Sequence, residues 1–456
     1  MKFLRILAAL PLFTVGLWAA DSVDHGITTP ESMFPQLETI LNQAVAQSPT
    51  MLARAVDQEI AENDRKMARA GLLPSVGGYY RFQKAEEKRA DFQTGRPDGE
   101  RIPSDKTYFD FSITQPVFHW GERKNNDQIG QIRLALAKQN YREAYRVYAD
   151  TIRAFYLRLI GDKLRVTRAE YANARTQDLR KRSEDRLAKK EISEAQMFSI
   201  RVDADRSQIT AERTRMEYEN NKQVFARLTG LPVLPDDQIP DDIPVVRDEG
   251  AALQAALAGF LAQDKPQTAA AVTNQKMLEI EKRNLAIAKV RLLPKVSAQA
   301  GINQDEQTYG ISLNSRYSVN SLYYGFSVNW SIFDGFAAGA AKRNAYARIR
   351  QLERDYRAIT EQLAATAQYQ AKMAGYAMRY AMVNERLVES SEGNLSVKRE
   401  DFTRGVTSED DVAAAQLNVY DTRLIALSSR LDYYNQITDF LGTIAQDPVL
   451  KNIPTQ

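Results

Sequence analysis

The segment Leu322–Phe333, with the sequence LYYGFSVNWSIF, alternates large apolar side chains with smaller or polar ones. Tyr108–Thr114, with the sequence YFDFSIT, does the same in the first half of the chain. Alternation with a period of two indicates a β-strand, and about ten such residues are typical of a strand that crosses a membrane in a barrel. A soluble, half-buried hairpin would show the same alternation. The apolar positions that would face lipid are Phe109, Phe111, Ile113, Phe326, Val328 and Trp330.

A shorter alternating run precedes each of these segments. We therefore expect strands at about 75–83 and 107–117, and again at about 296–304 and 322–333. The tripeptide Leu-Leu-Pro introduces both hairpins, at 72–74 and 292–294, so the chain is predicted to be a tandem duplication. The expected parts are a signal peptide at 1–20, a leader at 21–35, a first repeat at 36–230, a linker at 231–249, a second repeat at 250–447 and a tail at 448–456.

Long helices follow each hairpin. From about Gly121 to Ala188 there is no proline, and a matching stretch starts near Ala338. Apolar residues recur there at steps of three and four, which is the heptad seam of helices that supercoil on partners. About 65 helical residues would span about 100 Å, far more than the width of a globular domain. The predicted seam positions are Tyr141, Tyr145, Tyr148, Ile152, Phe155, Leu159 and Val166, then Ile349, Leu352, Tyr356, Ile359, Leu363, Met373, Ala377, Tyr380 and Leu387.

The start of the chain and its composition indicate an exported protein that is not an enzyme. Residues 1–20 carry Lys2 and Arg5, then a short apolar core and small residues, which is the pattern of a secretory signal peptide. The chain has no cysteine, two histidines and a formal net charge of +3. These values exclude disulfides and thiolate sites, and they argue against histidine-based catalysis, metal sites and nucleic-acid binding. We expect no catalytic residue, no metal and no cofactor.

Four strands are too few to close a membrane barrel, since the smallest barrels have about eight. Open strand edges in lipid would leave backbone groups unpaired, at a cost of several kcal/mol each. If these strands cross a membrane, several copies of the chain must therefore pool them. The strand count alone allows two, three or four copies.

Repeated halves, Leu-Leu-Pro before each hairpin and long heptad helices after it resemble the TolC-type outer-membrane efflux proteins, over about residues 36–447. The resemblance implies a mainly α fold with a small β part, in which a homotrimer closes one barrel of twelve strands, four from each copy, continued by an α-helical periplasmic tunnel. The linker 231–247 and the segment after Gly442 would form an equatorial region around the tunnel. Such a protein is a passive exit channel of the bacterial outer membrane, in a tripartite efflux pump or a type I secretion system. Its implied partners are outer-membrane lipid, a periplasmic adaptor (membrane fusion) protein and an inner-membrane transporter.

The resemblance places the functional region at the periplasmic tip, where helices reverse. Ser193 and Ser408 each precede a Gln or Asp three residues later, which predicts a capping box after each reversal. The family's aromatic-x-x-Gly pattern matches 402–405 and puts Asp411 on the first of two aspartates that narrow the closed tunnel. The second falls on Ala414, so Asp410 and Glu409 are the candidates to complete the constriction. The implied adaptor-docking residues are Gly405, Val406, Thr407, Lys190 and Ile192, with Lys190 replacing a glycine of the family.

Two alternatives stay open at this point. The acidic residues after Ser408 would also be explained by helix capping alone. A soluble periplasmic coiled-coil adaptor or scaffold would contain the long helices but would need no lipid-facing strands. The exported cargo is not specified by the sequence.

Overall fold

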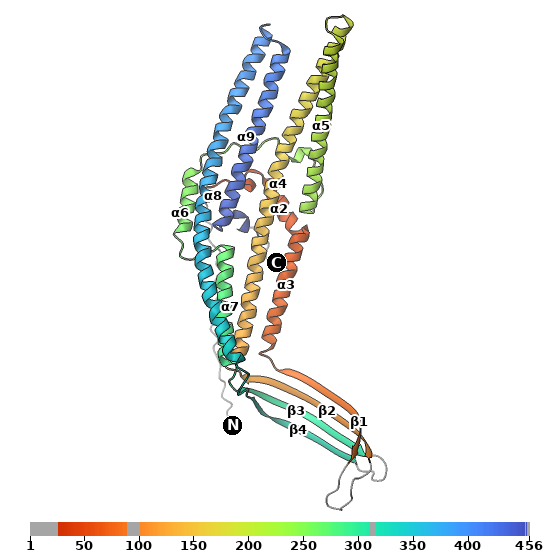
Figure 1. The fold of residues 1–456 in the computed structure, drawn as a ribbon, viewed down its shortest axis with the longest axis vertical. Helices are drawn as coiled ribbons and strands as arrows, with labels where there is room; N and C mark the ends of the chain where they lie inside the picture. Colours follow the sequence, from red (N-terminus) through yellow and green to blue (C-terminus); the bar gives the residue numbers. More distant parts are fainter. Residues whose placement is uncertain (1–25, 89–100, 310–315, 452, 454–456) are drawn as a thin grey trace, which may run out of the picture.

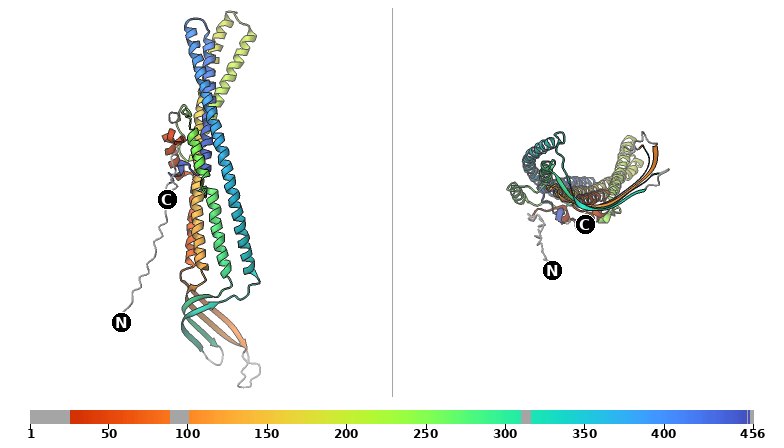
Figure 2. Two further views of the ribbon diagram at one scale, coloured as in Figure 1. Left: turned by 90° about the vertical axis from the view of Figure 1, so that its left-hand side faces the viewer. Right: turned by 90° about the horizontal axis from the view of Figure 1, so that it is seen from below.

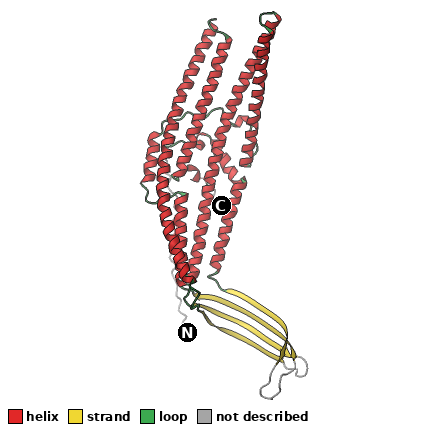
Figure 3. Cartoon of the chain, viewed as in Figure 1, coloured by secondary structure: helices red, strands yellow, loops and turns green. Residues whose placement is uncertain are grey.

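The computed structural model describes residues 26–88, 101–309, 316–451 and 453. The predicted signal peptide and the start of the leader lie outside these residues. The first half contains α1 Pro30–Met33, α2 Pro35–Gln47, α3 Pro49–Ala70, β1 Ser75–Lys88, β2 Arg101–Phe118, α4 Glu122–Ala188 and α5 Glu194–Thr229. The second half contains η1 Asp236–Gln238, α6 Gly250–Leu261, α7 Ala269–Val290, β3 Lys295–Tyr309, β4 Arg316–Asn329, α8 Ala337–Thr403, α9 Glu409–Thr443 and η2 Pro448–Lys451. The strands gather at one end of an elongated molecule and the helices form the rest (Figures 1 and 3).

The four strands form one antiparallel sheet in the order β1-β2-β3-β4. Most strands extend beyond their predicted bounds: β1 continues to Lys88, β2 begins at Arg101 and β3 continues to Tyr309. Polar residues at these ends weaken the alternation, so the sequence pattern ends before the backbone pairing does. Among the described residues, the outer edges of β1 and β4 pair with no other strand.

The predicted end of the last strand is wrong. β4 spans Arg316–Asn329, so Trp330 lies just beyond it. The chain leaves the sheet there for a turn in which Gly335 and Phe336 both have positive φ, at 64° and 68°. The indole Nε1 of Trp330 donates a hydrogen bond to the carbonyl of Leu292 at 3.0 Å.

The helices form an arc on top of the sheet. α4 and α8 each have 67 residues, which corresponds to about 100 Å. Near the sheet the neighbouring helices are α3, α4, α7 and α8, and towards the far end they are α5, α4, α9 and α8. Viewed from the sheet end, these helices and the sheet follow an open arc, with α2 and the C-terminal segment on its convex side (Figure 2). Within the described ranges, the helices lack a stretch that is long and apolar enough to cross a membrane.

The two predicted heptad seams have different outcomes. In α4 the seam is buried, and Tyr145, Ile152 and Leu159 have no exposed surface. In α8, towards the far end, Ala377 is buried as predicted, but the prediction is wrong for Tyr380 and Leu387, which are exposed. The buried face of α8 at this level consists mainly of small residues, beside the larger Met378, and these allow α9 to approach closely. These small residues are Ala367, Ala371, Ala374 and Ala381.

A buried ionic cluster ties both ends of the chain to the middle of α4. The guanidinium of Arg153, 1% exposed, donates two hydrogen bonds to the Asp447 carboxylate, both at 2.8 Å. It also pairs with Asp150 of α4 at 2.8 Å and with Glu31 of α1. Buried charges are tolerated only when paired in this way, so the cluster fixes α1 and the C-terminal segment on α4.

A second cluster ties the segment between α5 and α6 to the helices. Arg430 of α9 donates two hydrogen bonds to Glu385 of α8, at 2.6 and 2.7 Å, and one to Asp242 at 2.8 Å. The Glu249 carboxylate accepts from the hydroxyl of Tyr433 at 2.9 Å and from the backbone N–H of Thr28 at 3.2 Å. Segments distant in sequence thus converge at the middle of the helices.

Replacing Arg153 by Ala should destabilise the protein by about 3–5 kcal/mol, because Asp447 would remain buried without its partner. Denaturant unfolding followed by the helical circular dichroism signal measures this free energy. The matched control is Arg213→Ala, which removes an exposed pair with Glu217 within one helix and should cost less than about 1 kcal/mol. Equal losses for the two variants would contradict a structural role of the buried cluster.

Candidate functional site at the helix reversals

The second reversal, between α8 and α9, contains Asp411 in a capping role. Its N–H donates to the Ser408 hydroxyl at 3.1 Å, and its carboxylate accepts from the hydroxyl and the N–H of Ser408, at 2.6 and 3.1 Å. The Thr407 hydroxyl donates to the same oxygen at 2.9 Å. These hydrogen bonds, foremost that of the Ser408 hydroxyl, lower the pKa of Asp411 to about 2. Asp411 is therefore charged at neutral pH, and its stabilising contribution is lost only as the pH falls from about 4 towards 2.

The first reversal, between α4 and α5, has the same cap. The Ser193 hydroxyl accepts from the Gln196 N–H at 3.2 Å, and the Gln196 side chain accepts from the Ser193 N–H at 2.9 Å. Both predicted capping boxes are thus confirmed. Lys190 has a φ of +62°, and its counterpart Gly405 has a φ of +74°. The two reversals lie at the same end of the molecule, with Lys190, Gly405 and Val406 exposed and Ile192 and Thr407 half-buried (Figure 1).

Glu409 and Asp410 pair with two arginines of α4. Arg182 lies 2.9 Å from Glu409 and 3.5 Å from Asp410, and Arg175 contacts the same two carboxylates. We call these four residues the tip ion cluster. It connects the helix pair α4–α5 to the pair α8–α9 near their free ends. Neither arginine was predicted as a site residue, although their spacing of seven residues places them on one face of α4.

Two more contacts connect α4 to α9 below the tip ion cluster. Arg168 donates to the Asp421 carboxylate at 2.9 and 3.3 Å. The rings of Tyr171 and Tyr420 lie 5.5 Å apart. Exposed ion pairs of this kind contribute about 0–1 kcal/mol each, so each of the ion pairs between α4 and α9 near the tip is weak.

The strand residues predicted to face lipid gather on one face of the sheet. Phe111 is paired with Ile302 across β2 and β3, and Ile302 with Leu322 across β3 and β4. Directly paired residues point to the same side, so this face also holds Tyr80, Phe109, Ile113, Tyr324, Phe326 and Val328. The other face is more polar, and there the Tyr323 hydroxyl donates to Asp110 at 3.0 Å. We call the first of these the apolar sheet face; its large side chains are exposed.

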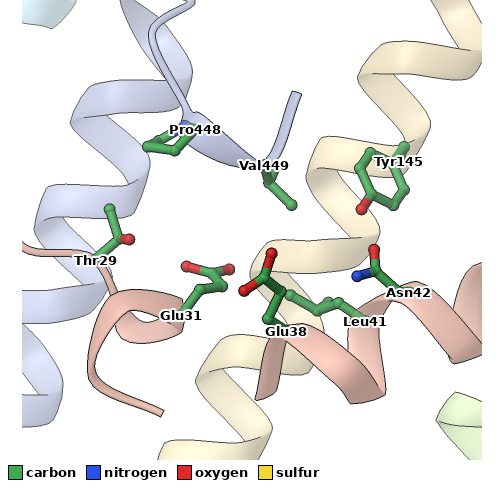
Figure 4. A pocket seen from close by; sticks show the side chains of 8 residues that line it. All are labelled: Thr29, Glu31, Glu38, Leu41, Asn42, Tyr145, Pro448 and Val449. Carbon is green, nitrogen blue, oxygen red and sulfur yellow. The ribbon is translucent and has the colours of Figure 1, made fainter. Parts of the chain in front are cut away.

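A small pocket lies between the N-terminal segment, α4 and η2 (Figure 4). Its volume is about 50 Å³, and Tyr145 and Glu31 are among the residues that line it. Such a volume holds one or two water molecules, and the buried Tyr145 hydroxyl, which has no partner among the described residues, is suited to bind one. The pocket is too small for a transported molecule.

The two caps can be separated by mutation. Asp411→Ala should increase hydrogen–deuterium exchange in the first turn of α9, since three hydrogen bonds to its carboxylate are lost, and leave the first turn of α5 unchanged. Gln196→Ala is the matched control, and it should increase exchange in the first turn of α5 while leaving the first turn of α9 unchanged. Mass spectrometry of the peptides around 408–412 and 193–197 measures both, and faster exchange at both turns in either variant would contradict independent caps.

Part of the first half of the chain matches a known family model. Residues 40–183 match the family model described as outer membrane efflux protein. A search of the curated proteins finds no relative of this chain by sequence.

Several solved structures have the same fold. The outer membrane protein VceC from Vibrio cholerae is 14% identical, with a TM-score of 0.66, over 91% of this chain and 97% of its own. The CmeC outer membrane channel of Campylobacter jejuni is 13% identical, with a TM-score of 0.68, over 90% of this chain and 86% of its own. The MtrE outer membrane channel of Neisseria gonorrhoeae, in its open state, is 12% identical, with a TM-score of 0.64, over 90% of this chain and 89% of its own. Residues 40–183 thus resemble the outer membrane efflux protein family, and the described chain has the fold of these solved outer membrane proteins.

Proposed function

We propose that three copies of this chain form a passive exit channel, in which their sheets close one barrel in the outer membrane and their helices form a periplasmic tunnel. The observation that carries the proposal is a four-stranded sheet with one apolar face, whose two edges pair with no other described strand and which is attached to helices of about 100 Å. Three such sheets supply twelve strands, which is an even number within the range of known barrels. In this arrangement the 231–247 segment and the C-terminal end form the equatorial region.

Channels of this family work with a periplasmic adaptor and an inner-membrane transporter. For this chain we place the adaptor contact at the two reversals, around Gly405, Val406, Thr407, Lys190 and Ile192. Val406 supports this, since this apolar side chain is 74% exposed at the reversal. The proposed channel is part of a tripartite efflux pump or of a type I secretion system.

The tip ion cluster is the proposed closing element of the tunnel. Because Glu409 and Asp410 are held by Arg175 and Arg182, the two helix pairs of a protomer can separate only when these ion pairs break. Weak individual pairs suit an element that must open during transport. In this proposal Asp411 adds fixed negative charge beside the cluster, as the first layer of the constriction.

Planar-bilayer recording tests channel and closure together. Detergent-purified mature protein should have the mass of a trimer and give discrete channels. The double variant Arg175→Ala/Arg182→Ala should raise single-channel conductance, since the acids would no longer hold the helix pairs together. Arg213→Ala, which changes an exposed arginine of α5, should leave it unchanged.

Two outcomes would contradict parts of this proposal. A soluble monomer that never inserts would overturn the channel. Normal channels with unchanged conductance in the double variant would remove the tip ion cluster from closure. Asp411→Ala distinguishes the roles of that residue, because a constriction residue should affect conductance and block by divalent cations, whereas a cap should affect neither.

The apolar sheet face is tested by Phe326→Arg. An arginine near the middle of the bilayer should cost about 2–4 kcal/mol and impair assembly in the outer membrane. Phe326→Leu should assemble normally, and Ser327→Arg, on the opposite face, should be tolerated better. The measurement is the amount of trimer in outer-membrane fractions, and normal assembly of Phe326→Arg would show that this face does not contact lipid.

A further inference from the structure

The two edges of the helical arc expose complementary surfaces. Near the sheet, α3 is the last helix at one edge, where it packs on α4, and α8 is the last helix at the other, where it packs on α7. On α8 the half-buried residues Ile349, Leu352 and Tyr356 share one side of the helix. The opposite side, about half a helical turn away, carries exposed arginines around Ala347: Arg343, Arg350, Arg354 and Arg357.

These arginines have no ion-pair partner among the described residues of the protomer. In the part of the chain that the structure describes, no carboxylate lies within ion-pair distance of Arg343, Arg350, Arg354 or Arg357. Their neighbour Arg348, which points to another side, pairs with Glu281 of α7 at 3.4 Å. Three of these arginines, Arg350, Arg354 and Arg357, line an open depression together with Ala347 and Glu353, a shape that accepts a side chain from a partner helix.

The outer side of α3 offers matching chemistry. Its half-buried residues, such as Ala55, Gln58 and Arg65, lie on one side. The opposite side carries an exposed apolar stripe at Leu52, Val56, Ile60 and Met67. Asp57 and Asp64 flank this stripe, and both are exposed. Asp57 lies 3.1 Å from Arg54 of the same helix, an exposed pair of the weak kind that an arginine of a second copy can join or replace. An apolar stripe bordered by acids fits long arginine side chains, whose aliphatic stems cover the stripe while the guanidinium groups reach the carboxylates.

The charges also match in height above the sheet. Arg343 and Arg350 lie six and thirteen residues after the first residue of α8, which adjoins β4. Asp64 and Asp57 lie six and thirteen residues before the last residue of α3, which adjoins β1. At 1.5 Å per residue, both pairs lie about 9 and about 20 Å from the helix ends next to the sheet. α3 and α8 run in opposite directions, so this antiparallel register aligns Arg343 with Asp64 and Arg350 with Asp57.

A second match occurs towards the tip. There α5 exposes Ile209 and Met216, which lie fifteen and twenty-two residues after its start. α8 exposes Leu387 and Tyr380, which lie sixteen and twenty-three residues before its end. Both distances are measured from the tip, so apolar residues of the two edges again stand at equal heights.

We infer that the outer side of α8 docks on α3 and α5 of a second copy of this chain, with Arg343 and Arg350 paired to Asp64 and Asp57 of that copy. The inference rests on the proposed trimer and names its contact surfaces. The sheet supports it independently, because β1 follows α3 and β4 precedes α8. Pairing of β4 with the next copy's β1 would therefore bring these two helices together. Such a head-to-tail contact closes a ring when the rotation fits.

Cysteine cross-linking tests this register, since the native chain has no cysteine. The variant Arg350→Cys/Asp57→Cys, oxidised in its native oligomer, should give covalent dimers and trimers on non-reducing gels. Arg343→Cys/Asp64→Cys should do the same. The matched control Lys282→Cys/Asp57→Cys keeps one thiol but moves the other to α7, between α4 and α8, and should stay monomeric. A bond within one protomer is excluded because α3 and α8 lie at opposite edges of the arc.

Charge reversal gives a second readout. Arg350→Asp should reduce the fraction of trimer, and Arg350→Asp combined with Asp57→Arg should restore it, whereas Lys282→Glu should have no effect. A normal trimer without cross-links in either pair, or without any response to reversal, would overturn the inferred interface and leave the channel intact. Changed conductance after a charged thiol reagent reacts with Arg350→Cys would place this side in the tunnel and also overturn it. A monomeric parent protein would instead overturn the proposed function.

Discussion

The unpaired backbone at the two edges of the sheet is the constraint on which the rest of the structure depends. β1 and β4 each present a row of N–H and C=O groups that no described strand satisfies. One face of the same sheet is apolar across all four strands, so exposing it to water is unfavourable. Placing the edges in lipid is also unfavourable, because their backbone groups would have no hydrogen-bond partners. Only further strands resolve both conflicts, and in the proposed trimer another copy of the chain provides them.

Along the length of the molecule, the helices are held together tightly in the middle and weakly near the tip. The buried clusters around Arg153 and Arg430 hold the chain ends and the inter-repeat segment against α4, α8 and α9. Beyond them, towards the reversals, the contacts between α4 and α9 become exposed and polar, as with Arg168 and Asp421. A rigid middle and a weakly connected tip allow movement at one end without disturbing the sheet at the other.

The sequence predicted what depends on local periodicity. Alternation placed Phe109, Phe326 and their neighbours on one face, and the Ser408 pattern predicted a cap, because each needs only nearby residues. Trp330 was misplaced because β3 begins at Lys295, opposite Asn329, so the strand pairing ends there while the alternation continues. Tyr380 was assigned to the buried seam because a heptad pattern does not say which side of a helix faces its partner.

Contacts between segments that are distant in the sequence could not be predicted from local periodicity. Arg175 and Glu409 are separated by 234 positions, and no local pattern connects them. The same holds for Arg153 and Asp447, which are 294 positions apart. The resemblance to a family supplied the place of the tip, but the pairing of Glu409 and Asp410 with arginines required the structure.

The equal length of α4 and α8 has a consequence for how such a chain can evolve. An insertion of one residue in α8 would rotate every later side chain by about 100° and displace one reversal from the level of the other. Insertions of seven residues preserve the faces, but they must occur in all four helices that reach the tip to keep both reversals level. Proteins of this fold should therefore differ in the length of the helical part by steps of about 10 Å that are the same in all four helices, and intermediate lengths should be selected against.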